Sequence, residues 1–163
     1  MTSLSQASHE HHDRLMPHVD RLAELAEMLG ESVAPGFQEA CEAEHRFITG
    51  QLLPHIEAIE TTLYDDLDRL MQGRHSMAPM RREHEELRRL IGSMGEYHEL
   101  VTQGRLGPAE AIGLRRALYR LHAMLRVHLA EEELYLRVLD RNLSAAEIDQ
   151  LARGIEHANA EPM

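Results

Sequence analysis

Apolar side chains recur every three or four positions along most of this chain, a spacing that places them on one face of an α-helix. The series is clearest between Leu114 and Leu139, where leucines dominate the repeat. Gly and Pro gather at 30–36, 72–79 and 103–108, and each of these clusters interrupts the repeat. The pattern predicts four helices, near residues 9–29, 37–70, 78–102 and 109–141.

A fifth, shorter helix is predicted after Ser144. Ser144 and Glu147 have the spacing of a capping box, in which each side chain bonds to the backbone N–H of the other residue. Because short connections join the long amphipathic helices, we predict an all-α fold, an up-down-up-down four-helix bundle with a short C-terminal capping helix. The 163 residues have the length of a single domain, 1–163, with the bundle at about 8–141 and the last helix at about 144–158.

The composition agrees with a helical core and narrows the partners. Hydrophobic residues make up 43% of the chain and aromatic residues only 4%, with nine Met and no Trp, so aliphatic side chains and Met fill the core. The net charge of −11 disfavours nucleic acid and anionic membranes as partners and favours cations. No apolar run reaches the ~20 residues needed to cross a bilayer, so we expect no membrane span.

The single cysteine and the first residues bear on location. Cys41 has no second cysteine with which to form a disulfide within the chain, and we expect a buried thiol. The first twelve residues lack the apolar run of a secretion signal. From these features we expect a cytoplasmic protein.

The most unusual number in the composition is the count of histidines, which is twelve. In an antiparallel hairpin, two residues that are equidistant from the turn lie at the same height. His12 and His55 are equidistant from the first Gly-rich cluster, and His84 and His128 are equidistant from the third. Four histidines, one from each predicted helix, therefore share one level of the bundle.

Two carboxylates accompany these histidines. Glu132 follows His128 by four residues and so lies on the same helical face. Glu60 follows His55 by five residues, and Ile59 takes the four-residue position. A buried carboxylate beside buried imidazoles needs a counter-charge or must become neutral, which predicts a cation between the helices. Mixed imidazole and carboxylate donors suit iron or manganese better than copper.

On these residues the chain resembles the hemerythrin-like family, also called the HHE cation-binding domain, and is most similar to its mycobacterial-type members. The matching text is His12 with Leu15, together with HIEAIETTLY, EHEELRRLI and HLAEEELYL, over about residues 8–140. The resemblance implies two non-haem irons joined by an oxo or hydroxo bridge. The metal ligands that it implies are His12, His55, Glu60, His84, His128 and Glu132.

The chain departs from the family pattern at two positions. The family has Glu where this chain has Ile59, so Glu60 would bridge the irons from a five-residue spacing. Pro54 cannot donate a backbone hydrogen bond, and we expect the helix to change phase there and to turn Glu60 inward. The third helix carries Arg88 where oxygen carriers of the family have a further histidine. That replacement disfavours reversible oxygen carriage.

Other histidines leave alternatives open. The apolar face of the first helix points between His11 and His12, and Leu15, three residues after His12, favours His12 as the ligand. His18 and His45 lie on or near core faces, where a hydrogen-bonded core imidazole is the simpler interpretation and an outer role at the centre is the alternative. Three further histidines fall near ends or in loops, where we expect solvation: His9, His75 and His157.

Two tyrosines also face the predicted level. Tyr135 follows His128 by seven residues and points inward, either as a core aromatic or as a phenol that hydrogen-bonds to or ligates an iron. Tyr64, four residues after Glu60, is the weaker candidate for the same role.

Open coordination positions on two irons allow direct chemistry with small ligands. We therefore expect an oxidoreductase with peroxidase- or catalase-like activity, whose partners are the small molecules hydrogen peroxide, nitric oxide and oxygen. One alternative is an oxygen or iron sensor or store without turnover. Another is a structural bundle whose histidines are incidental. The oligomeric state is open.

Overall fold

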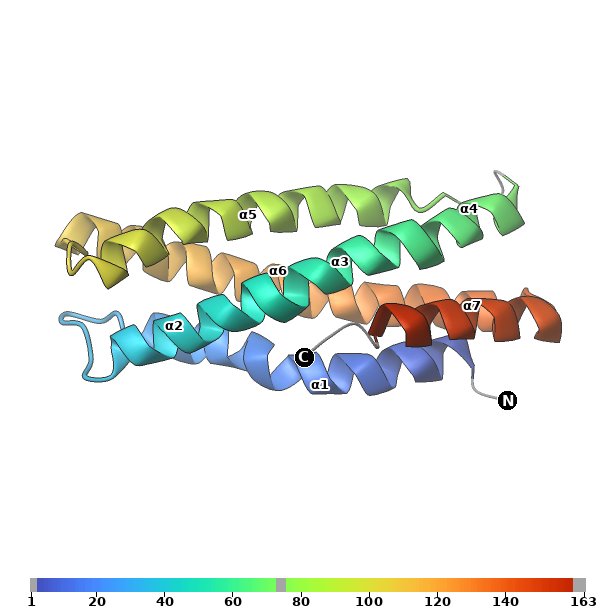
Figure 1. The fold of residues 1–163 in the computed structure, drawn as a ribbon, viewed down its shortest axis with the longest axis horizontal. Helices are drawn as coiled ribbons and strands as arrows, with labels where there is room; N and C mark the ends of the chain where they lie inside the picture. Colours follow the sequence, from blue (N-terminus) through green and yellow to red (C-terminus); the bar gives the residue numbers. More distant parts are fainter. Residues whose placement is uncertain (1–2, 73–75, 160–163) are drawn as a thin grey trace.

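The computed structural model describes residues 3–72 and 76–159, which form helices joined by short loops. Four helical rods run alternately up and down beside one another, as predicted (Figure 1). The helices are α1 (Leu4–Glu27), α2 (Phe37–Phe47), α3 (Leu53–Ile59), α4 (Asp65–Met71), α5 (Ala78–Thr102), α6 (Pro108–Asp140) and α7 (Ala145–Asn159). Within the described ranges, no helix combines the length and the apolar character needed to cross a membrane.

The second predicted helix is a single rod made of α2, α3 and α4, with two short π-helical turns between them, Ile48–Leu52 and Glu60–Tyr64 (Figure 1). The first turn precedes Pro54, and in it the N–H of Leu53 bonds to the carbonyl of Ile48, five residues back. Pro54 has no N–H for the carbonyl four residues before it, so a widened turn suits this sequence. The expected change of phase is thus present, and the second π turn places Tyr64 in the interior.

α1 begins at Leu4, about five residues earlier than the apolar pattern predicted. Two interactions stabilise this extra turn. The hydroxyl of Ser3 accepts a hydrogen bond from the N–H of Gln6 (3.1 Å), and Asp140 at the end of α6 accepts bonds from the N–H groups of Leu4 (2.8 Å) and Ser5 (3.1 Å). A carboxylate at a helix N-terminus satisfies N–H groups that have no partner within the helix. Asp140 therefore joins the start of α1 to the end of α6.

The capping box before α7 is present: the Glu147 carboxylate accepts from the N–H of Ser144 (2.7 Å), and the Ser144 hydroxyl accepts from the N–H of Glu147 (3.4 Å). The position of α7 differs from the expected cap. The helix lies along the side of the bundle, against α1, α3 and the second π turn, because Leu151, Ala152 and Ile155 form an apolar face that packs there (Figure 1).

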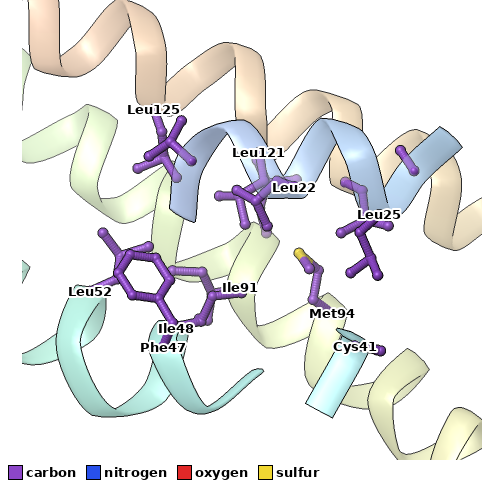
Figure 2. Packing of buried hydrophobic residues seen from close by; sticks show 14 of the residues in the cluster. Leu22, Leu25, Cys41, Phe47, Ile48, Leu52, Ile91, Met94, Leu121 and Leu125 are labelled. Atoms are coloured by element: carbon purple, nitrogen blue, oxygen red, sulfur yellow. The ribbon is translucent and has the colours of Figure 1, made fainter. Parts of the chain in front are cut away.

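The buried apolar residues form two clusters, one at each end of the bundle. In the larger cluster, Leu22 and Leu25 of α1 face Cys41 and Phe47 of the second rod and Met94 of α5 (Figure 2). The smaller cluster contains residues near the start of α1, the second π turn, the end of α6 and α7. Along each rod the sequence passes from one cluster to the other. The polar level described next lies at this boundary.

Candidate metal centre

Seven polar or charged side chains are buried among the described residues, and five of them are predicted ligands: His12, His55, His84, His128 and Glu132. His12 and His84 lie where their helices pass from one apolar cluster to the other, and His55 and His128 lie near that point, each followed by one more residue of the larger cluster. His84, for example, lies between Met80 of the smaller cluster and Leu87 of the larger. The predicted common level is therefore present.

The Nε2 atoms of three imidazoles point to a shared space. His84 Nε2 and His128 Nε2 are 2.9 Å apart. Glu132 Oε2 lies 3.6 Å from His128 Nε2 and 3.9 Å from His12 Nε2, and it is buried without a hydrogen-bond partner. A buried carboxylate oxygen without a donor is costly, and a bound cation relieves that cost.

The opposite ring nitrogen of each of these imidazoles contacts a carboxylate. Nδ1 of His128 lies 2.7 Å from Glu83 Oε2, Nδ1 of His84 lies 2.9 Å from Glu60 Oε1, and Nδ1 of His12 lies 3.3 Å from Glu133 Oε1. A carboxylate at Nδ1 fixes the tautomer that leaves the Nε2 lone pair free for a metal, an arrangement typical of histidine ligands. The donor set therefore fits a metal ion.

Two of these three carboxylates, Glu83 and Glu133, were not predicted from the sequence. Glu83 directly precedes His84. Glu133 is the last of three consecutive glutamates, a pattern typical of a solvent-exposed helical face. Glu133 also contacts Nδ1 of His9 (3.0 Å). The side chain of His9 is 54% exposed. The alternation of Glu and His in EHE is a signal for this arrangement, but only the fold shows that Glu83 contacts His128 and not its neighbour.

Glu60 contacts two groups. Besides His84 Nδ1, it accepts two hydrogen bonds from Arg88, to Oε1 from Nη1 (3.2 Å) and to Oε2 from Nη2 (2.7 Å). Arg88 and His84 outweigh partial burial and lower the pKa of Glu60, so it is a carboxylate at neutral pH. In this position Glu60 orients His84, and its role as a bridging ligand stays a prediction.

His55 is surrounded by other imidazoles. Its ring stacks on that of His11 with 4.2 Å between centroids, and its Nδ1 is buried without a partner. Burial and the neighbouring histidines, among them His12, His84 and His128, lower the pKa of His55 well below its usual value. Neutral imidazoles are the form that binds metals.

His11 and His12 both reach this level. His12 is fully buried, and His11 is partly buried with an Nε2 atom that has no partner. Burial lowers the pKa of His11 to about 4. Burial and His128 lower the pKa of His84 to about 4 as well. His12 has the carboxylate at Nδ1 that a ligand needs, whereas His11 packs on His55, so the geometry favours His12 as the ligand.

Tyr64 is the tyrosine that contacts the site. Its ring lies parallel to that of His84 with 5.3 Å between centroids, and its hydroxyl is buried without a hydrogen-bond partner. Burial, Glu132 and Glu60 raise the pKa of Tyr64 above its usual value. Tyr135, which the helical spacing favoured, is half-buried against the smaller cluster, where burial and Asp68 raise its pKa.

The remaining described histidines near the core form contacts of their own. His18 stacks on Phe47, and His45 stacks on His98 with 3.7 Å between centroids. Nε2 of His98 lies 2.6 Å from Glu42. His18 and His45 are thus half-buried imidazoles held by ring stacking, and the expected hydrogen bond is absent at Nδ1 of His18, which is buried without a partner. Neither His75 nor the side chain of His157 lies among the described residues.

Among the residues that the structure describes, no three His, Cys, Asp or Glu side chains stand in a geometry that already holds a metal ion. His84 and His128 contact each other directly through Nε2 (2.9 Å), so an ion between them requires both rings to move apart.

A comparison with protein families identifies the family of the chain. The model of the hemerythrin HHE cation-binding domain matches residues 4–139. The chain belongs to the hemerythrin family. The matched span includes every predicted ligand. Neither a search of curated proteins nor one of solved structures found a match.

Proposed function

We propose that this hemerythrin domain holds two irons at the level of the four buried histidines and reduces small oxidants, with hydrogen peroxide as the leading substrate. The observation that carries the proposal is the set of three imidazoles whose Nε2 atoms share one space while carboxylates contact Nδ1. Nε2 of His12, His84 and His128, Glu132 Oε2 and His55 would serve as donors, and Glu60 is the remaining candidate bridge. When bound, two irons supply reversible electron storage and open positions for a small ligand.

The residues of the chain exclude water and fix the ligands. The two apolar clusters enclose the level from both ends, so the donors lie in a medium of low dielectric constant. Glu60, Glu83 and Glu133 hold their histidines through Nδ1, which keeps each ring oriented with Nε2 toward the shared space, where Nε2 of His12 also lies 3.2 Å from the hydroxyl of Ser8. Fewer protein ligands leave more positions for substrate, and Arg88 stands where a further histidine would bind.

Tyr64 is placed to donate a hydrogen bond to a small ligand at the centre. Its ring lies beside His84, its buried hydroxyl has no partner within the described residues, and its raised pKa keeps the phenol protonated at neutral pH. Reduction of one hydrogen peroxide to two water molecules consumes two electrons and two protons. Disproportionation of two peroxide molecules to oxygen and two water molecules needs no external reductant. Reaction of two nitric oxide molecules with one peroxide gives two molecules of nitrous acid.

The experiment combines metal content with turnover. Protein loaded with iron is expected to contain two irons per chain, to show a charge-transfer band in the near ultraviolet, and to evolve oxygen from peroxide or to form nitrite from nitric oxide and peroxide. Iron binding without either turnover would overturn the enzymatic proposal and favour a sensor or store. Fewer than two irons per chain would overturn the di-iron proposal.

A pair of histidine variants makes the test specific. His84→Ala is expected to abolish the band, because Nε2 of His84 is a proposed donor. His98→Ala is the matched control, since His98 is also an imidazole on α5 in contact with a glutamate, but it stacks on His45 away from the site. Equal loss in both variants would contradict the assignment.

A further inference from the structure

α6 is apolar on two opposite faces. One face packs into the bundle through buried residues such as Leu121 and Leu125. The other face is exposed. Among the described residues six large apolar side chains are exposed, and five of them belong to α6: Ile112, Tyr119, Val127, Leu134 and Val138. A soluble chain seldom leaves a continuous apolar strip uncovered, and such strips mark interaction surfaces.

Four of these residues form one straight strip. Ile112 and Leu134 each lie eleven residues from Ala123, and eleven residues make three turns of an α-helix. Tyr119 and Val127 lie four residues before and after Ala123, slightly to either side of the same line. The strip covers about 33 Å of helix at 1.5 Å per residue. We call these four residues and Ala123 the outer strip.

The spacing between the residues of the outer strip is the same from either end. Its spacings are seven, four, four and seven, with Ala123 at the centre. If a second copy of α6 lies antiparallel with Ala123 against Ala123, Ile112 of each copy meets Leu134 of the other, and Tyr119 lies at the height of Val127. Such an arrangement has twofold symmetry, which is the commonest symmetry of soluble homo-oligomers. Alanine at the centre lets the two helices approach closely.

One pair of charges beside the outer strip is complementary in the same register, and the two arginines that flank Ala123, Arg120 and Arg126, are neutralised within the chain by Glu86 and Asp20. Arg116 and Glu131 lie on the same side of the strip, and in the antiparallel pair Arg116 of one copy stands within one residue's rise of Glu131 of the other. Both residues are exposed. Neither forms a salt bridge within the described part of the chain. Instead Glu131 contacts Glu83, which carries the same charge.

The surface around the strip has room for a partner. Ile112 and Tyr119 line an open groove of about 700 Å³ together with Val33, Leu106 and Arg116. In the antiparallel register Leu134 of the second copy arrives beside Ile112, at the edge of this groove. α6 lies at the back of the bundle between α5 and α1, and α7 packs elsewhere (Figure 1).

From this symmetry and charge pattern we infer that the outer strip of α6 is a dimer interface, on which a second copy of the chain packs antiparallel with its twofold axis at Ala123. The interface lies on the reverse side of the helix that carries His128 and Glu132.

The first test measures native mass. Sedimentation or light scattering of the full chain is expected to give twice 18.6 kDa, and Leu134→Glu to give 18.6 kDa. Gln150→Glu is the control, because Gln150 is exposed on α7, away from the outer strip and from the groove. A monomeric wild-type protein at the highest soluble concentration would overturn the inference. So would a dimer that Leu134→Glu leaves intact, since the interface would then lie elsewhere.

Two further variants test the register. Ala123→Cys is expected to form a disulfide-linked dimer on mild oxidation, because a residue on the twofold axis faces its own copy. Cys41 does not compete, since it is buried and burial raises its pKa to about 11. Arg153→Cys on the exposed side of α7 controls for random collision. Equal cross-linking of both variants would contradict the proposed axis.

Charge reversal addresses the orientation of the two helices. Arg116→Glu is expected to weaken the dimer. Adding Glu131→Arg in the same chain is expected to restore it, because the two side chains that meet across the interface then have opposite charges again. Failure of the double variant to recover the dimer would contradict the antiparallel register.

Discussion

Arg88 donates hydrogen bonds to both carboxylate oxygens of Glu60, at 3.2 and 2.7 Å, and thereby holds that carboxylate against Nδ1 of His84. The position at which oxygen carriers of the family have an imidazole thus holds a guanidinium that orients a neighbouring group. Bidentate pairs of this kind are strong and geometrically specific. An arginine at this position therefore means one imidazole ligand fewer, but it also orients His84 through Glu60.

Arg88→Ala is expected to lower the affinity for iron by about 10- to 100-fold, the range found when outer partners of metal ligands are removed. The physical reason is that Glu60 loses both charged donors and no longer fixes His84. Competition with a chelator measures the affinity. Arg89→Ala is the matched control, because Arg89 pairs with Glu86 on the exposed side of α5. An unchanged affinity in Arg88→Ala would contradict the orienting role.

Glu83→Ala is expected to lower the affinity for iron by a similar factor of about 10 to 100, because Nδ1 of His128 loses its acceptor. The same chelator competition applies. Glu85→Ala removes an exposed glutamate two residues further along the same helix and is expected to change the affinity little. If both variants behave alike, the effect is one of overall charge, and the contact between Glu83 and His128 is not responsible.

The sequence predicted the four-helix architecture and the shared level because both follow from periodicity and chain length. His12, His55, His84 and His128 are equidistant from their turns, and the rise per residue then sets their height. The prediction that the helix changes phase near Pro54 has the same basis, since a missing N–H is visible in the sequence. Local rules determine these features.

Features that depend on pairing across helices were not predictable in this way. Glu83 contacts His128 on α6, although it is next to His84 in the sequence, because the direction of a side chain depends on the neighbouring helix. Tyr64 reaches the site through a π turn that shifts the helical phase, so the spacing rule favoured Tyr135. α7 lies along the bundle because its apolar face packs into the smaller cluster there. The capping box sets where α7 begins but not where it packs.

Glu44 provides a test of pH dependence away from the metal centre. It is buried, and burial raises its pKa to about 7 from 4.5. The folded state therefore binds more protons than the unfolded state between these values, and stability falls as the pH rises through that window. Glu44→Gln is expected to add about 1–2 kcal/mol to the free energy of unfolding at pH 8, and little at pH 4.

Denaturant unfolding at the two pH values measures this difference between wild type and variant. Glu42→Gln supplies a control of opposite sign, because the hydrogen bond with His98 lowers the pKa of Glu42. Its stabilising effect is present above the unfolded pKa and is lost as the pH falls, so Glu42→Gln is expected to be destabilising at pH 8. A Glu44→Gln variant that destabilises the protein at pH 8 would contradict the raised pKa of this buried carboxyl.

Asp140→Ala is expected to destabilise the fold by about 1–2 kcal/mol, the cost of losing a helix cap. Asp140 accepts bonds from the N–H groups of Leu4 and Ser5 across the bundle, and Ala leaves these groups without a partner. Thermal or denaturant unfolding measures the change. Asp149→Ala, which removes an exposed pair with Arg153, is expected to cost about 0.5 kcal/mol or less. Similar losses would contradict the capping role.

Tyr64→Phe separates stability from activity at the centre. The hydroxyl of Tyr64 is buried without a hydrogen-bond partner, and burying such a group costs about 1–3 kcal/mol, so its removal is expected to stabilise the metal-free protein. The same change is expected to slow peroxide turnover by the iron-loaded protein, because the ring beside His84 no longer carries a hydroxyl that can donate a hydrogen bond to the bound peroxide. Tyr135→Phe, at a half-buried ring in the smaller cluster, is expected to leave turnover unchanged. If Tyr64→Phe turns over peroxide as fast as the wild type, this tyrosine only packs against His84. If the variant is more stable but slower, the hydroxyl of Tyr64 serves the reaction at a cost in stability.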